Sequence, residues 1–218
     1  MQEPVRVTGM VLEVSPVGET DRRVVLLTKE RGKISAFARG ARKQGSRLMA
    51  ATNPFCFGEF ILYEGRNSYS LSEAVIRNYF EDMRMHFEEA CYGMYFLELM
   101  DYYTRENNDE REMLLLLYQS LRALLQAAYD NRLVRYIFEI KAVVLNGEYP
   151  GLPKNKDYEE STRYALQYIA DSSVEKLYSF KVSDEVLQEL EEIAGIYQRR
   201  FVDRKMKSLE ILEGLIYN

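Results

Sequence analysis

The hydrophobic pattern of this 218-residue chain changes its period near residue 78. Before that point, apolar and polar residues alternate in short runs, as in β-strands with one buried face. After it, apolar residues recur at intervals of three and four, as on one face of an α-helix. Strands followed by helices in this way indicate an α+β protein or separate domains. The sequence therefore predicts a multidomain α+β protein with a boundary near residue 78.

The first part contains five runs with the composition and alternation of strands. Apolar residues occupy odd positions before Gly9 and even positions after it, a phase change typical of a β-bulge or a sharp bend. Turn-forming residues separate later runs, as in residues 65–67. Short, bent strands of this number favour a five-stranded OB-fold β-barrel, which we predict over residues 1–78. The predicted strands cover residues 5–14, 22–28, 33–39, 55–64 and 68–76.

Residues 79–218 carry the helical pattern, and we predict an all-α helical domain there. Residues 146–153 combine Pro and Gly and form the clearest loop. Ser183 is a suitable N-cap for the last helix, because a serine hydroxyl accepts a hydrogen bond from an unpaired backbone N–H at a helix start. The predicted helices cover residues 80–105, 113–128, 133–145, 158–170 and 183–212.

Charge is distributed unevenly along the chain. Residues 1–80 hold 12 basic and 8 acidic side chains, whereas residues 81–218 hold 17 basic and 26 acidic ones. The densest basic segment, residues 29–47, has seven Lys or Arg and one acid in a chain whose net charge is −5. The local field, not the net charge, decides what docks at a patch. The pattern predicts a polyanion-binding module, although charge alone also fits a solvated basic loop without a partner.

The strand predicted over residues 33–39 has two different faces. Alternation directs Ile34, Ala36 and Ala38 to one face, which suits the barrel interior. The opposite face interleaves cations with the ring of Phe37, as in platforms for single-stranded nucleic acid, where cations follow phosphates and a ring stacks on a base. The alternative for Phe37 is to plug one end of the barrel.

A flexible basic loop, residues 40–47, continues from this strand and can follow a phosphate backbone without reading sequence. We therefore predict non-specific, strongly salt-dependent binding. The predicted nucleic-acid contacts are Arg31, Lys33, Phe37, Arg39, Arg42, Lys43 and Arg47. A second basic group lies on the predicted last helix, where the helix dipole by itself also favours cations near the C-terminus. That group comprises Arg199, Arg200, Arg204, Lys205 and Lys207.

No arrangement of residues indicates catalysis. His86 is the only histidine, and the GxSxG, GxGxxG, GxxxxGK[ST] and HExxH motifs are absent. Cys56 and Cys91 form no CxxC motif, and we expect them to be buried thiols in a reducing cytosol. We see no signal peptide and no apolar run near the roughly 18 residues of a membrane span. These features predict a non-enzymatic, cytoplasmic binding protein that does not bind membranes.

Two other classes of binding protein fit the same residues. One is a protein-interaction adaptor whose basic barrel recognises acidic protein tails. The other is an RNA-binding OB-fold protein, which uses the same cations and ring on a different polymer.

Short motifs follow one another along nearly the whole chain. They are GMVLE (residues 9–13), GETD (18–21), LTKERG (27–32), GARK (40–43), NPF (53–55), GEYP (147–150), YALQYI (164–169), KLYSF (176–180) and KSL (207–209). Their order and spacing resemble the bacterial RecO family of recombination and repair mediators.

The resemblance implies an OB-fold barrel that binds single- and double-stranded DNA, followed by a helical domain. It also implies strand annealing, and partnership with RecR and with the C-terminal tail of single-stranded-DNA-binding protein, so that recombinase RecA can load. Such a protein would be cytoplasmic and associated with the nucleoid. Arg132 and Arg135 are candidate cations at the rim of a groove for that tail, with ordinary helix-surface charges as the alternative.

One departure from the family concerns zinc. Many members carry two cysteine pairs that hold a zinc ion, in a region that corresponds to about residues 147–181 here. The first pair falls near Asn155 and Tyr158, and neither replaces a thiolate; the second pair has no counterpart. We therefore predict a chain without zinc, whose loop is held by packing of Tyr158, Tyr164 and Tyr168, or is simply looser.

Overall fold

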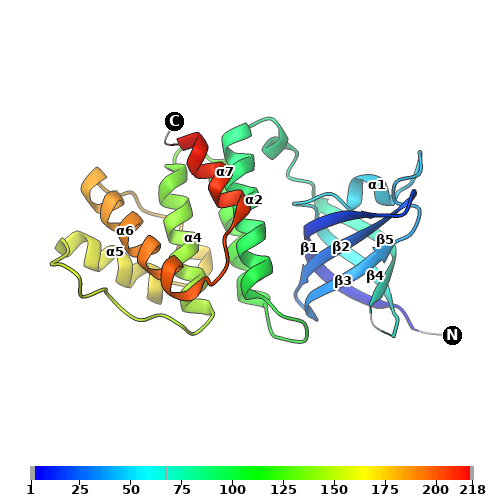
Figure 1. Ribbon diagram of the computed structural model, residues 1–218, viewed down its shortest axis with the longest axis horizontal. Helices are drawn as coiled ribbons and strands as arrows, with labels where there is room; N and C mark the ends of the chain where they lie inside the picture. Colours follow the sequence, from blue (N-terminus) through cyan, green and yellow to red (C-terminus); the bar gives the residue numbers. More distant parts are fainter. Residues whose placement is uncertain (1–2, 67, 217–218) are drawn as a thin grey trace. The chain divides into compact units, whose positions relative to one another are not determined.

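The computed structural model describes residues 3–66 and 68–216, with the side chain of Ile216 excepted. Asn67, in one of the predicted turns, lies outside the described residues. The chain divides into two compact units (Figure 1). The first unit runs to Met85 and also includes Leu97–Leu114; the second consists of His86–Phe96 and everything from Leu115 onward. Helix α2, Phe87–Tyr103, therefore contributes residues to both units.

The first unit contains the predicted barrel (Figure 1). Its strands close in the order β1-β2-β3-β5-β4, in which β3 and β5 pair in parallel. This five-stranded topology confirms the predicted OB-fold. The strands are β1 (Val5–Val17), β2 (Asp21–Thr28), β3 (Gly32–Ala38), β4 (Phe57–Glu64) and β5 (Tyr69–Asn78).

Strand β1 bends so that it can pair on both sides. Its first half pairs with β4 and its second half with β2, and the two pairings overlap at Gly9 and Met10. A Cβ atom on Gly9 would lie 2.4 Å from the carbonyl oxygen of Leu27, so only glycine allows this approach. Of the two alternatives predicted at Gly9, a β-bulge or a sharp bend, the change of pairing partner fits the bend; the bulge lies at Leu12, where the register with β2 shifts between Val11 and Glu13.

Alternation along the strands fills the barrel interior. Ile34, Ala36 and Ala38 face inward, as predicted. Strand β2 is buried on both faces, because Val25 and Leu27 are covered as well. The interior cluster consists of Val7, Val11, Val24, Leu26, Ile34, Ala36, Ala38, Ala41, Cys56, Phe60, Leu62, Tyr69 and Leu71.

A short helix that the sequence did not predict, α1 (Leu48–Ala51), lies across one end of the barrel (Figure 1). The guanidinium of Arg22 on β2 donates to the carbonyl oxygen of Met49 at 2.8 Å, to Thr52 Oγ1 at 2.9 Å and to Asn53 Oδ1 at 3.1 Å. One arginine thereby fixes the connection between β3 and β4.

The segment after α2 extends the β2–β3 hairpin. The backbone N–H of Lys33 donates to the carbonyl oxygen of Arg105, and that of Asn107 donates to the carbonyl oxygen of Arg31, both at 2.9 Å. Gly32 adopts a φ of +64°, and a Cβ there would lie 2.2 Å from the oxygen of Arg105. The turn therefore requires glycine for both conformation and space.

The helical part confirms an all-α architecture, with two corrections to the predicted helices. Phe80 is left-handed, with a φ of 48°, so a short 3₁₀ helix (Glu81–Arg84) precedes α2 in place of one continuous helix. The chain is extended at Val202, so the predicted last helix is two helices. After α2, the helices are α3 (Arg111–Leu124), α4 (Asn131–Leu145), α5 (Glu160–Asp171), α6 (Asp184–Phe201) and α7 (Lys207–Ile216).

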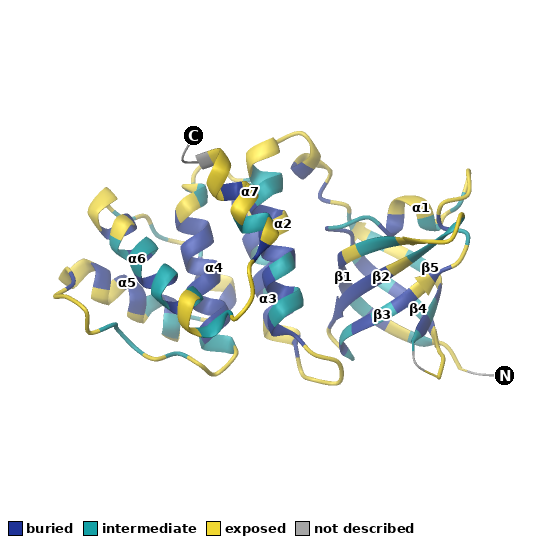
Figure 2. Cartoon of the chain, viewed as in Figure 1, coloured by how far each residue is buried: buried dark blue, intermediate teal, exposed yellow. Residues whose placement is uncertain are grey.

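Helix α4 forms the centre of the second unit and is almost entirely buried (Figure 2). Its buried residues include charges. Arg135 Nε donates to Glu139 Oε1 at 2.9 Å, the hydroxyl of Tyr95 donates to the same oxygen at 2.7 Å, and Arg135 also pairs with Glu213 of α7 at 3.3 Å. Arg135 is therefore an interior ion-pair partner and not a rim cation, while Arg132 pairs with Asp130 at the start of the helix. Among the residues placed by the structure, no helix is both long and apolar enough to cross a membrane.

Candidate nucleic-acid interface

The basic residues after β3 lie on consecutive turns rather than on the flexible loop we predicted. The N–H of Lys43 donates to the oxygen of Gly40 at 3.1 Å, and the N–H of Ser46 donates to the oxygen of Lys43 at 3.0 Å. The side chains of Arg39, Arg42, Lys43 and Arg47 are exposed. We refer to residues 39–47 as the basic loop.

The turn between β1 and β2 holds the basic loop in place. The N–H of Gly40 donates to Asp21 Oδ1 and the N–H of Arg42 donates to the oxygen of Thr20, both at 2.8 Å. The guanidinium of Arg42 also donates to the oxygen of Gly18 at 3.1 Å. The hydrogen bond from Gly40 keeps the pKa of the Asp21 carboxyl below its usual value. The loop thus has a fixed backbone beneath exposed cations.

Beside the basic loop, strand pairing aligns four side chains in one row across the outer face of the barrel. Arg23 on β2 lies opposite Phe37 on β3, Phe37 lies opposite Ser70 on β5, and Ser70 lies opposite Tyr63 on β4. Phe37 is 36% exposed and Tyr63 is 40% exposed. Phe37 therefore lies on the outer surface and does not plug the barrel.

A groove of about 410 Å³ follows this row. Its walls include both rings of the row, and Arg39 stands at the end of β3 beside it. Tyr63 was not predicted as a site residue, because alternation along β4 predicts the face on which Tyr63 lies but not the side chains beside it on other strands. The lining residues are Asp21, Phe37, Arg39, Tyr63, Glu64, Gly65, Ser68, Tyr69 and Ser70.

Two predicted contacts, Arg31 and Lys33, lie at the other end of β3, roughly 20 Å along the strand from Arg39. The ammonium of Lys33 pairs with Asp101 Oδ1 at 3.0 Å and also donates to the backbone oxygen of Asp101. Arg31 is half-buried, and its backbone oxygen accepts from Asn107. The structure therefore brings Phe37 and the cations of the basic loop together but places these two residues apart from them.

The second basic group does not lie on one helix as predicted. Arg199 and Arg200 end α6, Arg204 and Lys205 lie in the following linker, and Lys207 begins α7. All five side chains are exposed. The Arg200 guanidinium lies 5.2 Å from the ring of Phe201, and Lys205 lies 3.6 Å from Glu210. The break at Val202 is the reason that the group is divided.

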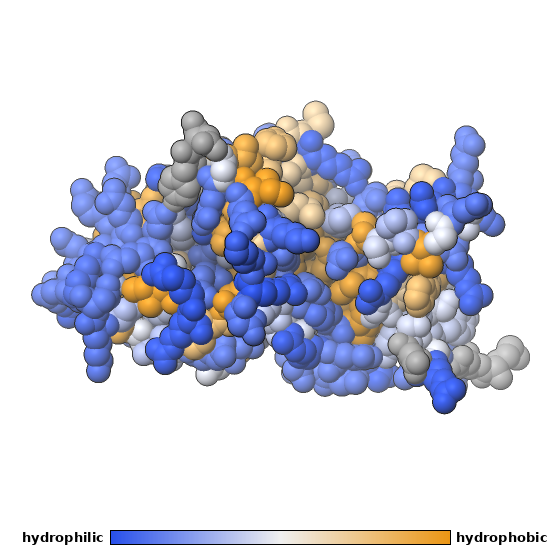
Figure 3. Space-filling view, in the orientation of Figure 1, coloured by the Kyte–Doolittle hydropathy of each residue, from blue (hydrophilic) through white to orange (hydrophobic). Residues whose placement is uncertain are grey.

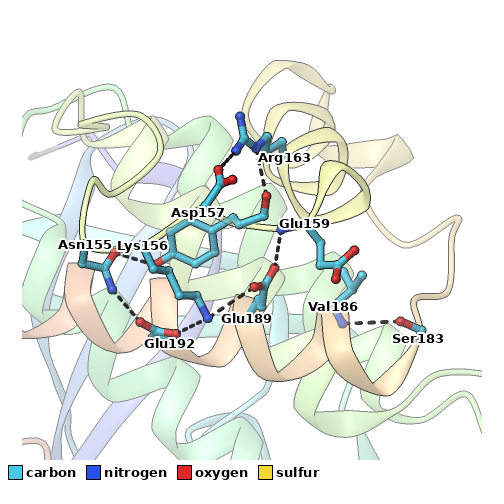
Figure 4. Close-up of polar contacts among 10 residues, drawn as sticks. Asn155, Lys156, Asp157, Glu159, Arg163, Ser183, Val186, Glu189 and Glu192 are labelled. Carbon is cyan, nitrogen blue, oxygen red and sulfur yellow. Dashed lines mark hydrogen bonds and ion pairs between the residues drawn. The ribbon is translucent and has the colours of Figure 1, made fainter.

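An ammonium group occupies the loop where the zinc ligands of the resembled family would fall. Lys156 Nζ lies 3.2 Å from Glu189 Oε1 and 2.8 Å from Glu192 Oε2 on α6 (Figure 4). Asn155 Nδ2 donates to Glu192 Oε1 at 2.6 Å, and the buried Tyr158 donates to Asn155 Oδ1 at 2.7 Å. The hydrogen bond from Lys156 keeps the pKa of Glu192 below its usual value. We call these residues the Lys156 network.

The residues of this loop do not suit zinc, which binds thiolate, imidazole or carboxylate ligands. The carboxylates of Glu189 and Glu192 are already paired with the Lys156 ammonium, with which a zinc ion would have to compete. Within residues 3–66 and 68–216, no group of three or more His, Cys, Asp or Glu side chains could hold a metal ion. The predicted packing by tyrosines is right for Tyr158, which is buried, and for Tyr168, whose ring lies 5.2 Å from that of Phe180. It is wrong for Tyr164, which is 74% exposed.

Comparisons with known proteins agree with the resemblance in the sequence. A family model described as Recombination protein O N terminal matches residues 1–80, and one described as Recombination protein O C terminal matches residues 85–155. The chain is 26% identical to a DNA repair protein RecO from Acetivibrio thermocellus, over 96% of each chain. It is 27% identical to one from Clostridium novyi, over 95% of this chain and 93% of that protein. It is 31% identical to one from Alkaliphilus metalliredigens, over 68% of this chain and 60% of that protein.

The position of Lys33 leads to a prediction that separates stability from nucleic-acid binding. We expect Lys33→Met to lower the free energy of unfolding by about 1–2 kcal/mol, because a half-buried Asp101 loses its charged hydrogen-bond donor. Affinity for single-stranded DNA should not change. Urea unfolding and fluorescence anisotropy measure the two effects.

Lys29→Met is the matched control, since Lys29 is an exposed cation of the same hairpin. It should alter neither quantity. A Lys33→Met protein with wild-type stability and weakened DNA binding would return Lys33 to the interface.

Proposed function

The chain belongs to the RecO family, and we propose that it is a repair and recombination mediator whose barrel binds single- and double-stranded DNA without reading sequence. Its place in this family makes it a DNA repair protein and a non-enzymatic mediator. In the proposal, the barrel of residues 1–78 holds DNA, and residues 79–218 supply the partner-binding domain.

The observation that carries the proposal is the basic loop on its fixed backbone. Four exposed cations, Arg39, Arg42, Lys43 and Arg47, lie within nine residues. The backbone N–H groups of Gly40 and Arg42 donate to the β1–β2 turn and hold the loop in place. Cations that neutralise phosphates release counterions and provide most of the affinity in non-specific binding. Contacts from a loop to phosphates carry no information about the bases, so they suit any sequence.

Strand annealing follows from the same contacts. Two single strands repel each other until their phosphates are neutralised, and mobile contacts to phosphates leave base edges free to pair. From the family resemblance we propose that the protein works in the cytoplasm, on the nucleoid, with RecR and single-stranded-DNA-binding protein, and so helps RecA to load.

A groove on the helical unit supports one of these partnerships. It measures about 690 Å³ and is lined by α5, by residues 179–183 and by the start of α6. Tyr164 and Phe180 provide aromatic walls; the exposed Lys181 provides a cation at one edge, and Glu160 a carboxylate at the start of α5. These features suit an acidic peptide with a hydrophobic end, such as the C-terminal tail of single-stranded-DNA-binding protein.

A second surface for proteins is available on α7. Ile211 is 62% exposed and Leu215 is also exposed, one helical turn further on. Figure 3 shows hydrophobic and hydrophilic side chains side by side in the region of this helix.

We further propose that this member of the family folds without zinc. The Lys156 network supports this, because it ties residues 155–159 to α6 through ion pairs and hydrogen bonds that need no metal. The loop is therefore attached to α6 by polar contacts where other members are expected to use thiolates.

The first test of DNA binding reverses the charges of Arg39, Arg42 and Lys43 together. We expect affinity for a labelled single-stranded oligonucleotide to fall at least about tenfold at low salt. The slope of log affinity against log salt should flatten by about 0.7 for each phosphate that the variant no longer neutralises. Fluorescence anisotropy at several salt concentrations provides both values.

A control with reversals at Arg122, Lys154 and Lys176 makes the same change in net charge outside the barrel, at exposed positions. It should retain most of the affinity. Unchanged binding by the barrel variant would exclude the basic loop as the docking surface. Stronger binding to RNA of the same sequence, or displacement of DNA by an acidic peptide, would favour the RNA-binding or adaptor class.

The groove is tested with a labelled acidic peptide that ends in hydrophobic residues. Lys181→Glu should weaken peptide binding about tenfold, because it places a like charge at the rim. Arg122→Glu, an exposed charge on α3 that does not line the groove, is the control and should bind normally. Equal affinities of the two variants would remove the groove from the proposal.

The metal-free fold is tested by thermal unfolding with and without a chelator. The chelator should not change the wild-type midpoint, whereas Lys156→Met should lower it by a few degrees at neutral pH. Lys154→Met, two residues away and exposed, should leave the midpoint unchanged. A fall in the midpoint on adding chelator, or stoichiometric zinc in the purified protein, would contradict the proposal.

The contacts between Lys156 and α6 also make the stability of the protein depend on pH. Because the folded pKa of Glu192 lies below its usual value of 4.5, its stabilising effect is complete above that pH and is lost as the pH falls through the folded pKa. The difference in unfolding midpoint between wild type and Lys156→Met should therefore become smaller at acidic pH.

A further inference from the structure

We propose that Phe37 and Tyr63 form a base-stacking site on the outer face of the barrel, which admits an unpaired nucleobase. This inference rests on the proposed DNA binding and deepens it, because it assigns the bases, and not only the phosphates, a place on the protein.

The pairing of the strands determines the site. Phe37 and Tyr63 both lie opposite Ser70, so a single small residue separates the two rings across the sheet. Neighbouring strands are about 4.8 Å apart, so the backbones that carry the rings are separated by roughly 10 Å. The groove between the rings runs over Ser70, whose side chain leaves the space open. A planar base that enters the groove over Ser70 can therefore stack on either ring.

Neither ring is explained by packing. The interior cluster of the barrel does not include them, and both are more than a third exposed on the outer face of the sheet. Aromatic side chains left at a surface in this way are typical stacking platforms for single strands.

The charges around the groove favour a base inside it and phosphates outside it. Asp21 and Glu64 line the groove, and their carboxylates disfavour a phosphate there. Arg39 stands at the edge of the groove, and Arg23 continues the row beyond Phe37, where its Nε donates to Ser35 Oγ at 2.7 Å. Both arginines lie on the Phe37 side of the groove, Arg23 across the row and Arg39 along β3, where they can hold the phosphates next to a base stacked on Phe37.

Only an unpaired base can enter this site, since a duplex keeps its bases stacked inside. The two rings should therefore contribute to binding of single strands alone, whereas the basic loop contributes to both forms of DNA. Stacking also involves no charge, so it should be independent of salt.

The experiment compares wild type with Phe37→Leu, Tyr63→Leu and Tyr63→Phe by fluorescence anisotropy. The probes are a labelled single strand, an abasic strand of the same length and a blunt-ended duplex without unpaired bases. Each leucine variant should bind the single strand about tenfold more weakly, with an unchanged salt slope. Binding to the abasic strand and to the duplex should remain at the wild-type level, and Tyr63→Phe should retain single-strand affinity.

Tyr79→Leu is the matched control, because Tyr79 is 36% exposed and lies outside the row. Thermal unfolding should show the same midpoint for all variants, since neither ring belongs to the core. An equal loss on all three probes, or wild-type affinity of the leucine variants for the single strand, would overturn the stacking site while leaving DNA binding intact. If the wild-type protein binds none of the probes at low salt, the proposed function fails and the stacking site with it.

Discussion

The parallel pairing of β3 with β5 is the contact on which the rest of the barrel depends. It involves only three residue pairs, Ala36 with Tyr69, Phe37 with Ser70 and Ala38 with Leu71. Within this ladder the inward residues of β3 are Ala36 and Ala38, so the larger Tyr69 and Leu71 can fill the interior beside them. Without this short ladder the sheet would have two open edges, and Phe37 and Tyr63 would not face a common neighbour. The same ladder therefore closes the barrel and brings Phe37 and Tyr63 next to Ser70.

The helical unit depends on a different constraint, which is the set of charges buried on α4. Arg135 and Glu139 satisfy each other, Tyr95 and Glu213 complete the cluster, and Lys141 donates to the carbonyl oxygens of Ala170 and Ser172 at the end of α5. Breaking one partner of a buried pair is costly, typically about 3–5 kcal/mol, because it leaves a charge without compensation. The cluster therefore fixes α2, α5 and α7 to α4 in one arrangement.

Several features of the interface followed directly from the sequence. Alternation placed Ile34, Ala36 and Ala38 inside the barrel, and the density of cations after β3 indicated a polyanion-binding surface. Lys33 was assigned to that surface by the same alternation, yet it pairs with Asp101, a residue 68 positions further along the chain. The local sequence pattern predicts the face on which a side chain lies, but not which distant residue packs against it. The same limit applied to Arg135, whose partner on α7 is 78 positions away.

The helices show a second limit. Their positions were predicted well because apolar spacing is a local property, but the breaks at Phe80 and Val202 were not, since neither residue is a Gly or Pro that would mark an interruption. For the zinc region, absence of the cysteines indicated that another arrangement must hold the loop. That Lys156 would lie between two carboxylates of α6 depended on how α6 packs.

The sequence by itself determined the kind of protein: a barrel of strands, then helices, a basic loop, no catalytic motif, and the order of motifs that marks the RecO family. These are properties of short segments, in which period, charge and composition act over a few residues. Only the tertiary structure decided that Tyr63 and Phe37 line the same groove and that Lys33 pairs with Asp101. It also decided that ion pairs and hydrogen bonds attach residues 155–159 to α6. Each of these joins side chains from distant segments, and only the pairing of strands and the packing of helices determine which distant segments meet.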